Sequence, residues 1–301
     1  MRCDCCPACC AAHAQDQCPP NAPVYQVPIP LYDSITLMFL HYPQTDRAEL
    51  PDVSEDASVL HYCLSGRAGF SLPDGSIRYL GDDEALLCRG GKRTLTFPNA
   101  CYDGMMLTFS GGVLPPPLAD TPVSAEMLKE KYLADSPLCL LPESDAMRTL
   151  LRSFFDLPAA LLPAAYQIKA QEALLYLYLQ PAPQSTSSPL YPAAQADVIR
   201  RVHDQLTQNL QQRITIEELS HQFLMNPSTL KAVFKDVYGN SIAAHIRDHR
   251  MERAAELLRD TELGMAQIAQ QIGYESASKF SAEFRKHFGL LPSEYRRAHK
   301  S

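Results

Sequence analysis

The segment from Ile268 to Arg297 reads IAQQIGYESASKFSAEFRKHFGLLPSEYRR. Its spacing predicts two short helices. The first ends at Gly273, because glycine tolerates the left-handed conformation that follows a helix. The second begins after Ser276, a good N-cap residue, and ends before Gly289. Two helices joined by a tight turn form a helix-turn-helix.

The second of these helices has two chemically different faces. Phe280, Phe284 and Phe288 recur at intervals of four, so they share one face, which we expect to be core. The residues between them are small, hydroxylated or basic, and we take as DNA-binding candidates Ser276, Ser278, Lys279, Ser281, Arg285 and Lys286. A recognition helix needs small residues to approach base edges, hydroxyls to form hydrogen bonds and cations to contact phosphate. The alternative is an ordinary solvated face.

This segment resembles the signature of the AraC/XylS family of bacterial transcription regulators. The matching residues are Ile268, Ala269, Gly273, Tyr274, Ser276, Phe280, Phe284, Arg285, Lys286, Gly289, Pro292, Tyr295 and Arg296. The resemblance implies that residues 195–301 form an all-α DNA-binding domain in which seven helices hold two helix-turn-helix units.

A first helix-turn-helix precedes the quoted segment. Thr215 and Glu218 have the spacing of a capping box for a helix over residues 216–224. Asn226–Pro227 provides a cap and a first position for the next helix, which ends at Gly239. Its outer face supplies further DNA-binding candidates: Ser228, Thr229, Lys231 and Lys235. The family often has an Arg where this chain has Ala232, so the contact made there is expected to be absent or to come from Lys231.

A long helix is expected between the two units, from Ser241 to about Asp260. At 1.5 Å per residue it would span ~30 Å. One turn of B-DNA is ~34 Å, so such a helix can place two recognition helices in adjacent major grooves of double-stranded DNA. Along it lie Arg247, Arg250 and Arg253, which we expect to pair with Asp248, Glu252 and Glu256 of the same helix. Contact with DNA phosphate is the alternative role.

The charge of the chain is unevenly distributed. The net charge of the 301 residues is −7, which on its own argues against a DNA binder. Residues 196–301 carry 15 Lys+Arg and 13 Asp+Glu, whereas residues 1–195 carry 12 and 21. The C-terminal part is therefore weakly basic and the rest acidic, and local basic faces matter more for phosphate than the total.

Six of the ten cysteines crowd the first eighteen residues: Cys3, Cys5, Cys6, Cys9, Cys10 and Cys18. We expect residues 1–22 to be a disordered tail with incidental thiols. Two alternatives remain open. The tail could serve a thiol- or metal-sensing regulator, since thiolates bind soft cations. The chain could also be an alkylation-repair methyl acceptor, because some of these proteins join an AraC-type unit to a reactive Cys on zinc.

Residues 23–180 are expected to form an effector domain, so that the chain as a whole is α+β. Short runs rich in β-branched and aromatic residues alternate with turn signals such as Asp74–Gly75. The expected strands cover residues 35–42, 58–64, 69–72, 76–80, 85–88, 94–97 and 105–109. Their spacing predicts a small antiparallel barrel or jelly roll, and it resembles the cupin-like barrel of many AraC relatives.

The expected barrel lacks the signature of a metal-dependent cupin. His41 and His61 are isolated, whereas such cupins carry two His one residue apart. No nucleophile elbow or phosphate loop is present either, so we expect no catalytic residue, metal ligand or cofactor. Tyr62, Arg67 and Tyr102 are the candidates for binding a small polar or anionic effector, and ordinary strand or turn roles are the alternative.

Two apolar helices follow, over residues 146–157 and 165–180. The second is too apolar to bury one side only, so it is expected to pack on the barrel or on a second subunit of a homodimer. Residues 181–194 are rich in Pro and Ser and read as an interdomain linker.

The sequence therefore predicts a sequence-specific DNA-binding transcription regulator that is not an enzyme. The resemblance implies an activator that works with RNA polymerase and responds to a small-molecule effector through a shift in population between states. No apolar run reaches the ~18 residues of a membrane span, and the start of the chain lacks the features of a secretory signal. We accordingly expect a cytoplasmic protein with no membrane partner.

Overall fold

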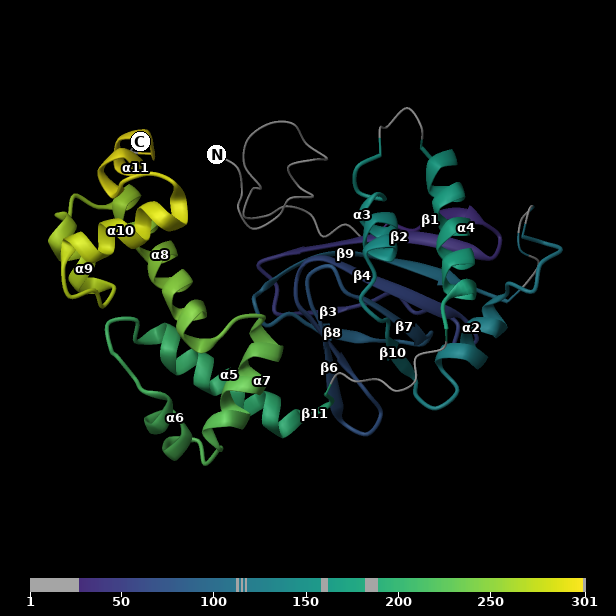
Figure 1. Cartoon of the computed structure of the whole chain (residues 1–301), viewed down its shortest axis with the longest axis horizontal. Helices are drawn as coiled ribbons and strands as arrows, with labels where there is room; N and C mark the ends of the chain where they lie inside the picture. The colour runs from purple at the N-terminus through teal and green to yellow at the C-terminus, as the bar shows by residue number, and fades with distance from the viewer. Residues whose placement is uncertain are drawn as a thin grey trace. The chain divides into compact units, whose positions relative to one another are not determined.

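The computed structural model describes residues 27–111, 114, 116, 118–157, 162–181 and 189–299. The chain forms two compact units, which divide after Pro192 (Figure 1). The Cys-rich segment 1–18 and the centre of the Pro/Ser segment, 182–188, lie outside the described residues. The expected domain boundaries remain predictions.

Unit 1 is built on two antiparallel sheets. The larger has the order β1 (Ile29–Tyr32), β2 (Ile35–Pro43), β9 (Cys101–Phe109), β4 (Ser58–Gly66), β7 (Ala85–Arg89) and β10 (Leu138–Leu140). The smaller has the order β11 (Tyr191–Pro192), β6 (Ser76–Leu80), β5 (Ala68–Ser71), β8 (Thr94–Thr96) and β3 (Arg47–Glu49). The α+β class is confirmed. The cupin-like barrel is not, because no strand pairing among the described residues joins the two sheets into a closed barrel.

The larger sheet is covered on both faces, so unit 1 has three layers (Figure 1). One face packs against the smaller sheet around buried residues such as Phe70 and Tyr102. The other face packs under α2 (Ala125–Tyr132), α3 (Asp145–Arg152) and α4 (Ala164–Leu179). Because both faces are buried, β4 reads as a continuous buried run and not as an alternation of apolar and polar residues.

Helix α4 buries one side and leaves another exposed. Ala170, Ala173 and Leu174 lie in the core beneath it. Ile168 and Leu179 are 67% and 75% exposed, and Leu175 is also exposed on the same side. An apolar stripe of α4 is thus left uncovered by its own unit.

Unit 2 contains seven helices among its described residues. They are α5 (Ala193–Gln208), α6 (Ile216–Gln222), α7 (Pro227–Tyr238), α8 (Ile242–Asp260), α9 (Met265–Gln271), α10 (Ala277–Phe288) and α11 (Pro292–His299). The predicted helix starts are confirmed, and of the predicted ends the one at residue 224 differs, because α6 ends at Gln222. Thr215 and Glu218 form both hydrogen bonds of a capping box, and Gly273 has a φ of +80° in the turn between α9 and α10. None of the helices in the described part of the chain is long and apolar enough to cross a lipid bilayer.

Candidate nucleic-acid interface

Helices α7 and α10 are equivalent elements separated by 50 positions along the chain. Each has 12 residues, begins after a polar N-cap and ends at a left-handed glycine. Asn226 caps α7 by accepting from the Ser228 N–H, and Ser276 caps α10 by accepting from the Lys279 N–H. On the inner side, Leu230 and Phe234 of α7 occupy the places of Phe280 and Phe284 of α10, and all four are buried. The two helices therefore dock in the same register.

The outer faces of both helices carry the predicted DNA-binding residues. The exposed ones are Ser228, Lys231 and Lys235 of α7, the cap residue Ser276, and Ser278, Lys279, Arg285 and Lys286 of α10. Thr229 and Ser281 are half-buried. Lys235 and Arg285 occupy equivalent places, so each helix presents a cation at the same point of its outer face. The structure therefore gathers the ten predicted residues on two similar surfaces.

One of these cations, Lys279, forms an ion pair with an acidic residue. Lys279 Nζ lies 2.6 Å from a carboxylate oxygen of Glu275, which also contacts Arg213 at 3.0 Å. The hydrogen bond from Lys279, together with the charges of Arg213 and Lys279, lowers the pKa of Glu275. Lys279 is thus partly neutralised by its neighbour. Glu283 is turned away from this surface toward Arg247 of α8, at 3.4 Å.

Helix α8 and its contacts fix the two helix-turn-helix units relative to each other. Its 19 residues span about 28 Å. The Arg250 guanidinium donates to the Leu210 carbonyl at 2.9 Å and to the Gln212 carbonyl at 3.3 Å. A Cβ placed at Gly273 would lie 2.7 Å from the same Leu210 oxygen. The turn of the second helix-turn-helix, between α9 and α10, therefore packs directly against the loop between α5 and α6.

The expectation that the α8 arginines pair within their own helix holds for two of the three. Arg253 contacts Glu256 at 2.7 Å, and Arg247 lies 3.7 Å from Asp248. Arg247 also reaches Glu283 of α10, whereas Arg250 binds the loop carbonyls. The prediction was wrong for Arg250 because sequence spacing shows only partners on the same helix, whereas the α5–α6 loop lies alongside α8.

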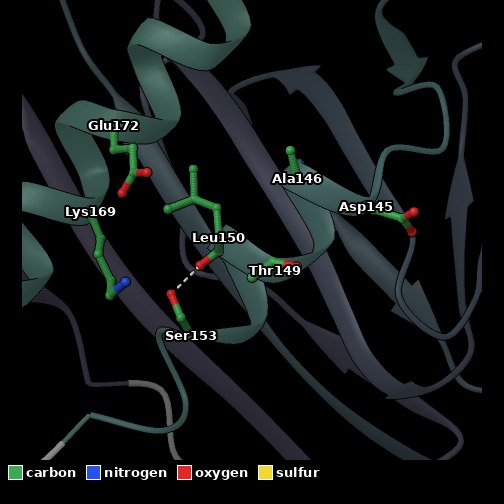
Figure 2. Close-up of a pocket in the computed structure, with 7 residues that line it drawn as sticks. All are labelled: Asp145, Ala146, Thr149, Leu150, Ser153, Lys169 and Glu172. Carbon is green, nitrogen blue, oxygen red and sulfur yellow. Dashed lines mark hydrogen bonds between the residues drawn. The ribbon is translucent and has the colours of Figure 1, made fainter.

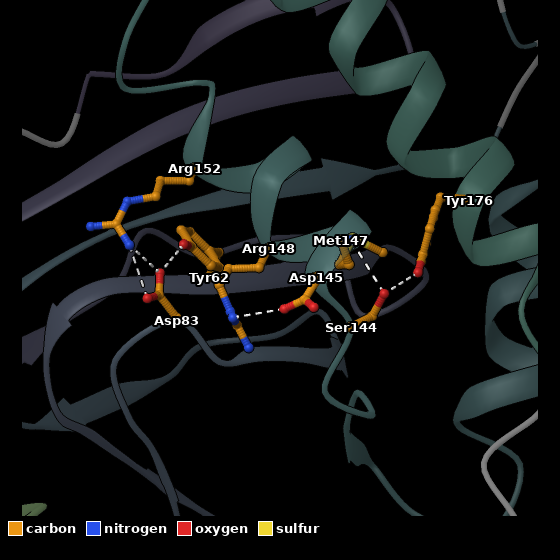
Figure 3. Close-up of polar contacts among 8 residues, drawn as sticks. All are labelled: Tyr62, Asp83, Ser144, Asp145, Met147, Arg148, Arg152 and Tyr176. Atoms are coloured by element: carbon orange, nitrogen blue, oxygen red, sulfur yellow. Dashed lines mark hydrogen bonds and ion pairs between the residues drawn. The ribbon is translucent and has the colours of Figure 1, made fainter.

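The three predicted effector-binding residues do not converge. Tyr62 belongs to the core under the helices and Tyr102 to the core between the sheets, on opposite faces of the larger sheet. The Tyr62 hydroxyl donates to Asp83 at 2.6 Å, and the same carboxylate accepts from Arg152 of α3 (Figure 3). Burial and this hydrogen bond raise the pKa of Tyr62. Tyr62 thus joins β4 to α3 through Asp83.

Of the other two effector candidates, Tyr102 is buried and Arg67 is half-buried. Tyr102 stacks on Phe97 at 5.1 Å, and burial raises the pKa of its hydroxyl. Arg67 packs against the backbone of Gly81, where a Cβ would lie 2.4 Å from its guanidinium.

An open groove of about 410 Å³ lies between α3 and α4 (Figure 2). It is lined by Asp145, Ala146, Thr149, Leu150, Ser153, Lys169 and Glu172. The Ser153 hydroxyl donates to the Leu150 carbonyl. None of the predicted effector-binding residues lines this groove.

Comparison with known proteins identifies the C-terminal unit. A helix-turn-helix domain family matches residues 219–298, which span α7, α8 and α10. The chain is 35% identical over 96 residues to the uncharacterized transcriptional regulator YdiP of Escherichia coli, covering 32% of each protein. It is 34% identical over 91 residues to the transcriptional activator RhaR of Mannheimia succiniciproducens, covering 30% of this chain and 33% of that protein.

Unit 2 is an AraC-type helix-turn-helix domain. The resemblance noted in the sequence is thereby confirmed for this part of the chain. Among solved structures, the C-terminal domain of AraT, a response regulator of Geobacillus stearothermophilus, is 32% identical, with a TM-score of 0.34 over 35% of this chain and 87% of that one. The chain spans about a third of the length of the curated relatives it matches.

The AraC-type domain also holds a histidine cluster that sequence reasoning missed. His203 of α5 lies beside His245 and His249 of α8. Burial and the charges of the other two rings lower the pKa of His245 to about 3. Burial also lowers the pKa of His203. The interval of four between His245 and His249 was the available signal, because it places both rings on one helix face.

Proposed function

We propose that the chain is a sequence-specific transcription regulator that inserts α7 and α10 into adjacent major grooves of double-stranded DNA. The observation that carries this proposal is the pair of equivalent, capped helices, each with a buried apolar side and an exposed side of hydroxyls and cations. The relatives support it, since they are described as transcription regulators.

The roles of individual residues follow from their place on the two helices. Lys235, Arg285 and Lys286 lie in the last turns, where a long cation reaches phosphate, and phosphate contacts set affinity and register. Ser278 lies in the first turn of α10 and Lys231 near the middle of α7, and both are exposed. Side chains at these places can reach base edges, and such contacts set sequence preference. Lys279 contributes less because Glu275 shares its charge.

The larger assembly is a further part of the proposal. The exposed stripe of α4 supports a homodimer, since dimerisation would cover Ile168, Leu175 and Leu179. Unit 1 would then bind a small effector and bias the arrangement of two DNA-binding domains. An activating role toward RNA polymerase is supported by the match to an activator. The cytoplasmic location expected from the sequence stays a prediction.

Salt-dependent DNA binding tests the proposal. The full chain is used to select a preferred duplex, and its affinity is then measured over a salt series. Each phosphate contact contributes about −0.9 to the slope of log K against log salt for B-DNA. Replacing Lys235 and Arg285 by Ala together should therefore reduce the slope by about two and weaken binding to every duplex.

Two matched variants separate phosphate contacts from general effects. Arg200→Ala removes a cation of α5 that is already paired with Asp197 at 2.7 Å, and it should leave the slope unchanged. Ser278→Ala should change the preferred sequence and keep the slope. If the Lys235/Arg285 double variant keeps the slope of the native chain, these cations do not contact phosphate and the assigned interface is wrong.

A further inference from the structure

Three imidazole rings converge behind the first recognition helix. One ring nitrogen from each of His203, His245 and His249 lies within 4.8 Å of those of the other two. His203 belongs to α5, whereas His245 and His249 belong to α8, so the cluster brings together residues that lie about 40 positions apart in the sequence. Among the described residues it is the one group of three or more side chains of this kind with metal-binding spacing.

The closest pair already has the separation that a metal ion would impose. The Nε2 atoms of His245 and His249 lie 3.1 Å apart. Two imidazole nitrogens bound at 2.0–2.1 Å to one tetrahedral Zn²⁺ ion are about 3.3 Å apart. A small rearrangement of the third ring, that of His203, would complete a three-nitrogen site.

Carboxylates orient two of the three rings. His203 Nδ1 lies 3.3 Å from Asp204, and His249 Nδ1 lies 3.5 Å from Glu252. Metal-binding histidines commonly donate one ring N–H to a carboxylate, which leaves the other nitrogen for the metal. Both pairings place Nδ1 at the outside, so Nε2 is the inward atom, as it already is in the His245–His249 pair.

Aromatic residues of α7 hold the cluster in place. Tyr238 stacks on His203 with ring centroids 4.4 Å apart, and Phe234 meets the edge of the His245 ring at 5.5 Å. His245 is only 8% exposed, whereas the His249 side chain is 34% exposed. The cluster is therefore fixed on its inner side and reachable by an ion from the side of His249.

We propose that His203, His245 and His249 bind one divalent transition-metal ion of the Zn²⁺ type through three imidazole nitrogens. The donor set is nitrogen only, which suits Zn²⁺, Co²⁺ and Ni²⁺ better than Mg²⁺ or Ca²⁺. The bound ion would cross-link α5 to α8 and hold the residues against which α7 packs. This inference does not depend on the proposed function, because an ion can bind here whether or not the domain binds DNA.

Cobalt spectroscopy of the full chain tests the site. The chain is stripped with a chelator, titrated with Co²⁺ and then with competing Zn²⁺. Visible d–d bands report a bound ion, and a near-ultraviolet band from sulfur to Co²⁺ marks cysteine ligands of the N-terminal segment. The expected result is one ion with nitrogen-only character, displaced by Zn²⁺, together with a rise in the thermal midpoint when Zn²⁺ is present.

Variants of the cluster identify the ligands. His203→Ala and His249→Ala should each lower the affinity of the nitrogen-only site at least tenfold and abolish the thermal shift. His221→Ala, on the exposed side of α6, is the matched control and should bind as the native chain does. Glu252 is an exposed residue, so Glu252→Gln should fold normally and keep all three rings. Because it removes the carboxylate beside His249, it should still lower the affinity for the metal ion about 10- to 100-fold.

The outcomes separate cleanly. Loss of the nitrogen-only ion in the two His variants, with retention in His221→Ala, supports the site. A nitrogen-only spectrum that is the same in all four variants overturns it. A native chain whose every bound Co²⁺ shows the sulfur band overturns it as well, since the metal would then be held by the cysteines.

Discussion

Replacing Gly273 by Ala should strain the second helix-turn-helix more than the equivalent change at Gly289. Both glycines end helical segments with left-handed φ values, +80° and +73°. A Cβ at Gly289 would meet nothing within 4 Å. A Cβ at Gly273 would lie 2.7 Å from the Leu210 oxygen and 2.9 Å from an Arg250 nitrogen.

The expected magnitudes follow from these surroundings. The left-handed conformation costs a residue with a Cβ about 1–2 kcal/mol at either position. At Gly273 the contact with a backbone oxygen adds the cost of overpacking, about 1–3 kcal/mol. The total is about 2–5 kcal/mol for Gly273→Ala and about 1–2 kcal/mol for Gly289→Ala. The extra cost should appear as a loss of the Arg250 hydrogen bonds to the α5–α6 loop.

Amide hydrogen exchange of the full chain, read by mass spectrometry, measures this region separately from unit 1. Gly273→Ala should speed exchange in α9, in α10 and in the loop 209–214. Gly289→Ala should act mainly at the end of α10 and the start of α11. If the two variants perturb exchange equally, or if loop 209–214 is unaffected by Gly273→Ala, the packing that we assign between the two helix-turn-helix units is wrong.

Two further predictions concern unit 1. His61 is 1% exposed, and its pKa is lowered to about 3, mainly by burial and also by the charge of Arg93. The ring in the unfolded chain takes up a proton near pH 6.5 and the folded one does not, so the stability of the fold should decrease as the pH drops from 6.5 toward 3. At about 1.4 kcal/mol per pH unit, the free energy of unfolding should decrease by roughly 2 kcal/mol between pH 6.5 and 5. The midpoint of urea unfolding should decrease less in His61→Leu than in the native chain, and an equal decrease would exclude His61 as the source. Ile168→Glu combined with Leu179→Glu should convert a dimer to a monomer in sedimentation velocity, whereas Leu224→Glu, at a 92% exposed apolar residue of unit 2, should not; a dimer that survives the α4 changes would remove α4 from the interface.

Local chemistry made the AraC-type domain predictable from the sequence. Asn226, Ser276 and Gly289 act within one helical turn of their own positions, so their caps were visible without a fold. The Phe280–Phe284 spacing identified the buried side of α10 and therefore its exposed side. These features needed no information about distant parts of the chain.

The sheet architecture was less predictable because it depends on pairing between distant residues. The seven expected strands are all present, but β1, β3, β10 and β11, of four residues or fewer, were missed. Three of them, β3, β10 and β11, are stabilised by partners far away in the sequence, as when Tyr191 pairs with Ile77, whereas β1 forms a hairpin with the neighbouring β2. Tyr62 of β4 and Tyr102 of β9 lie on opposite faces of the larger sheet for the same reason. The alternation of side chains along one strand does not show which side chains of another strand lie on the same face of the sheet.

The binding of α7 and α10 to adjacent grooves can be measured most directly by hydroxyl-radical footprinting of the full chain on its selected duplex. We predict two protected patches on one face of the DNA, centred about one helical turn (10–10.5 base pairs) apart. Arg285→Ala should weaken the patch bound by α10 more than the patch bound by α7. Protection of a single patch, or of none at low ionic strength, would contradict the account.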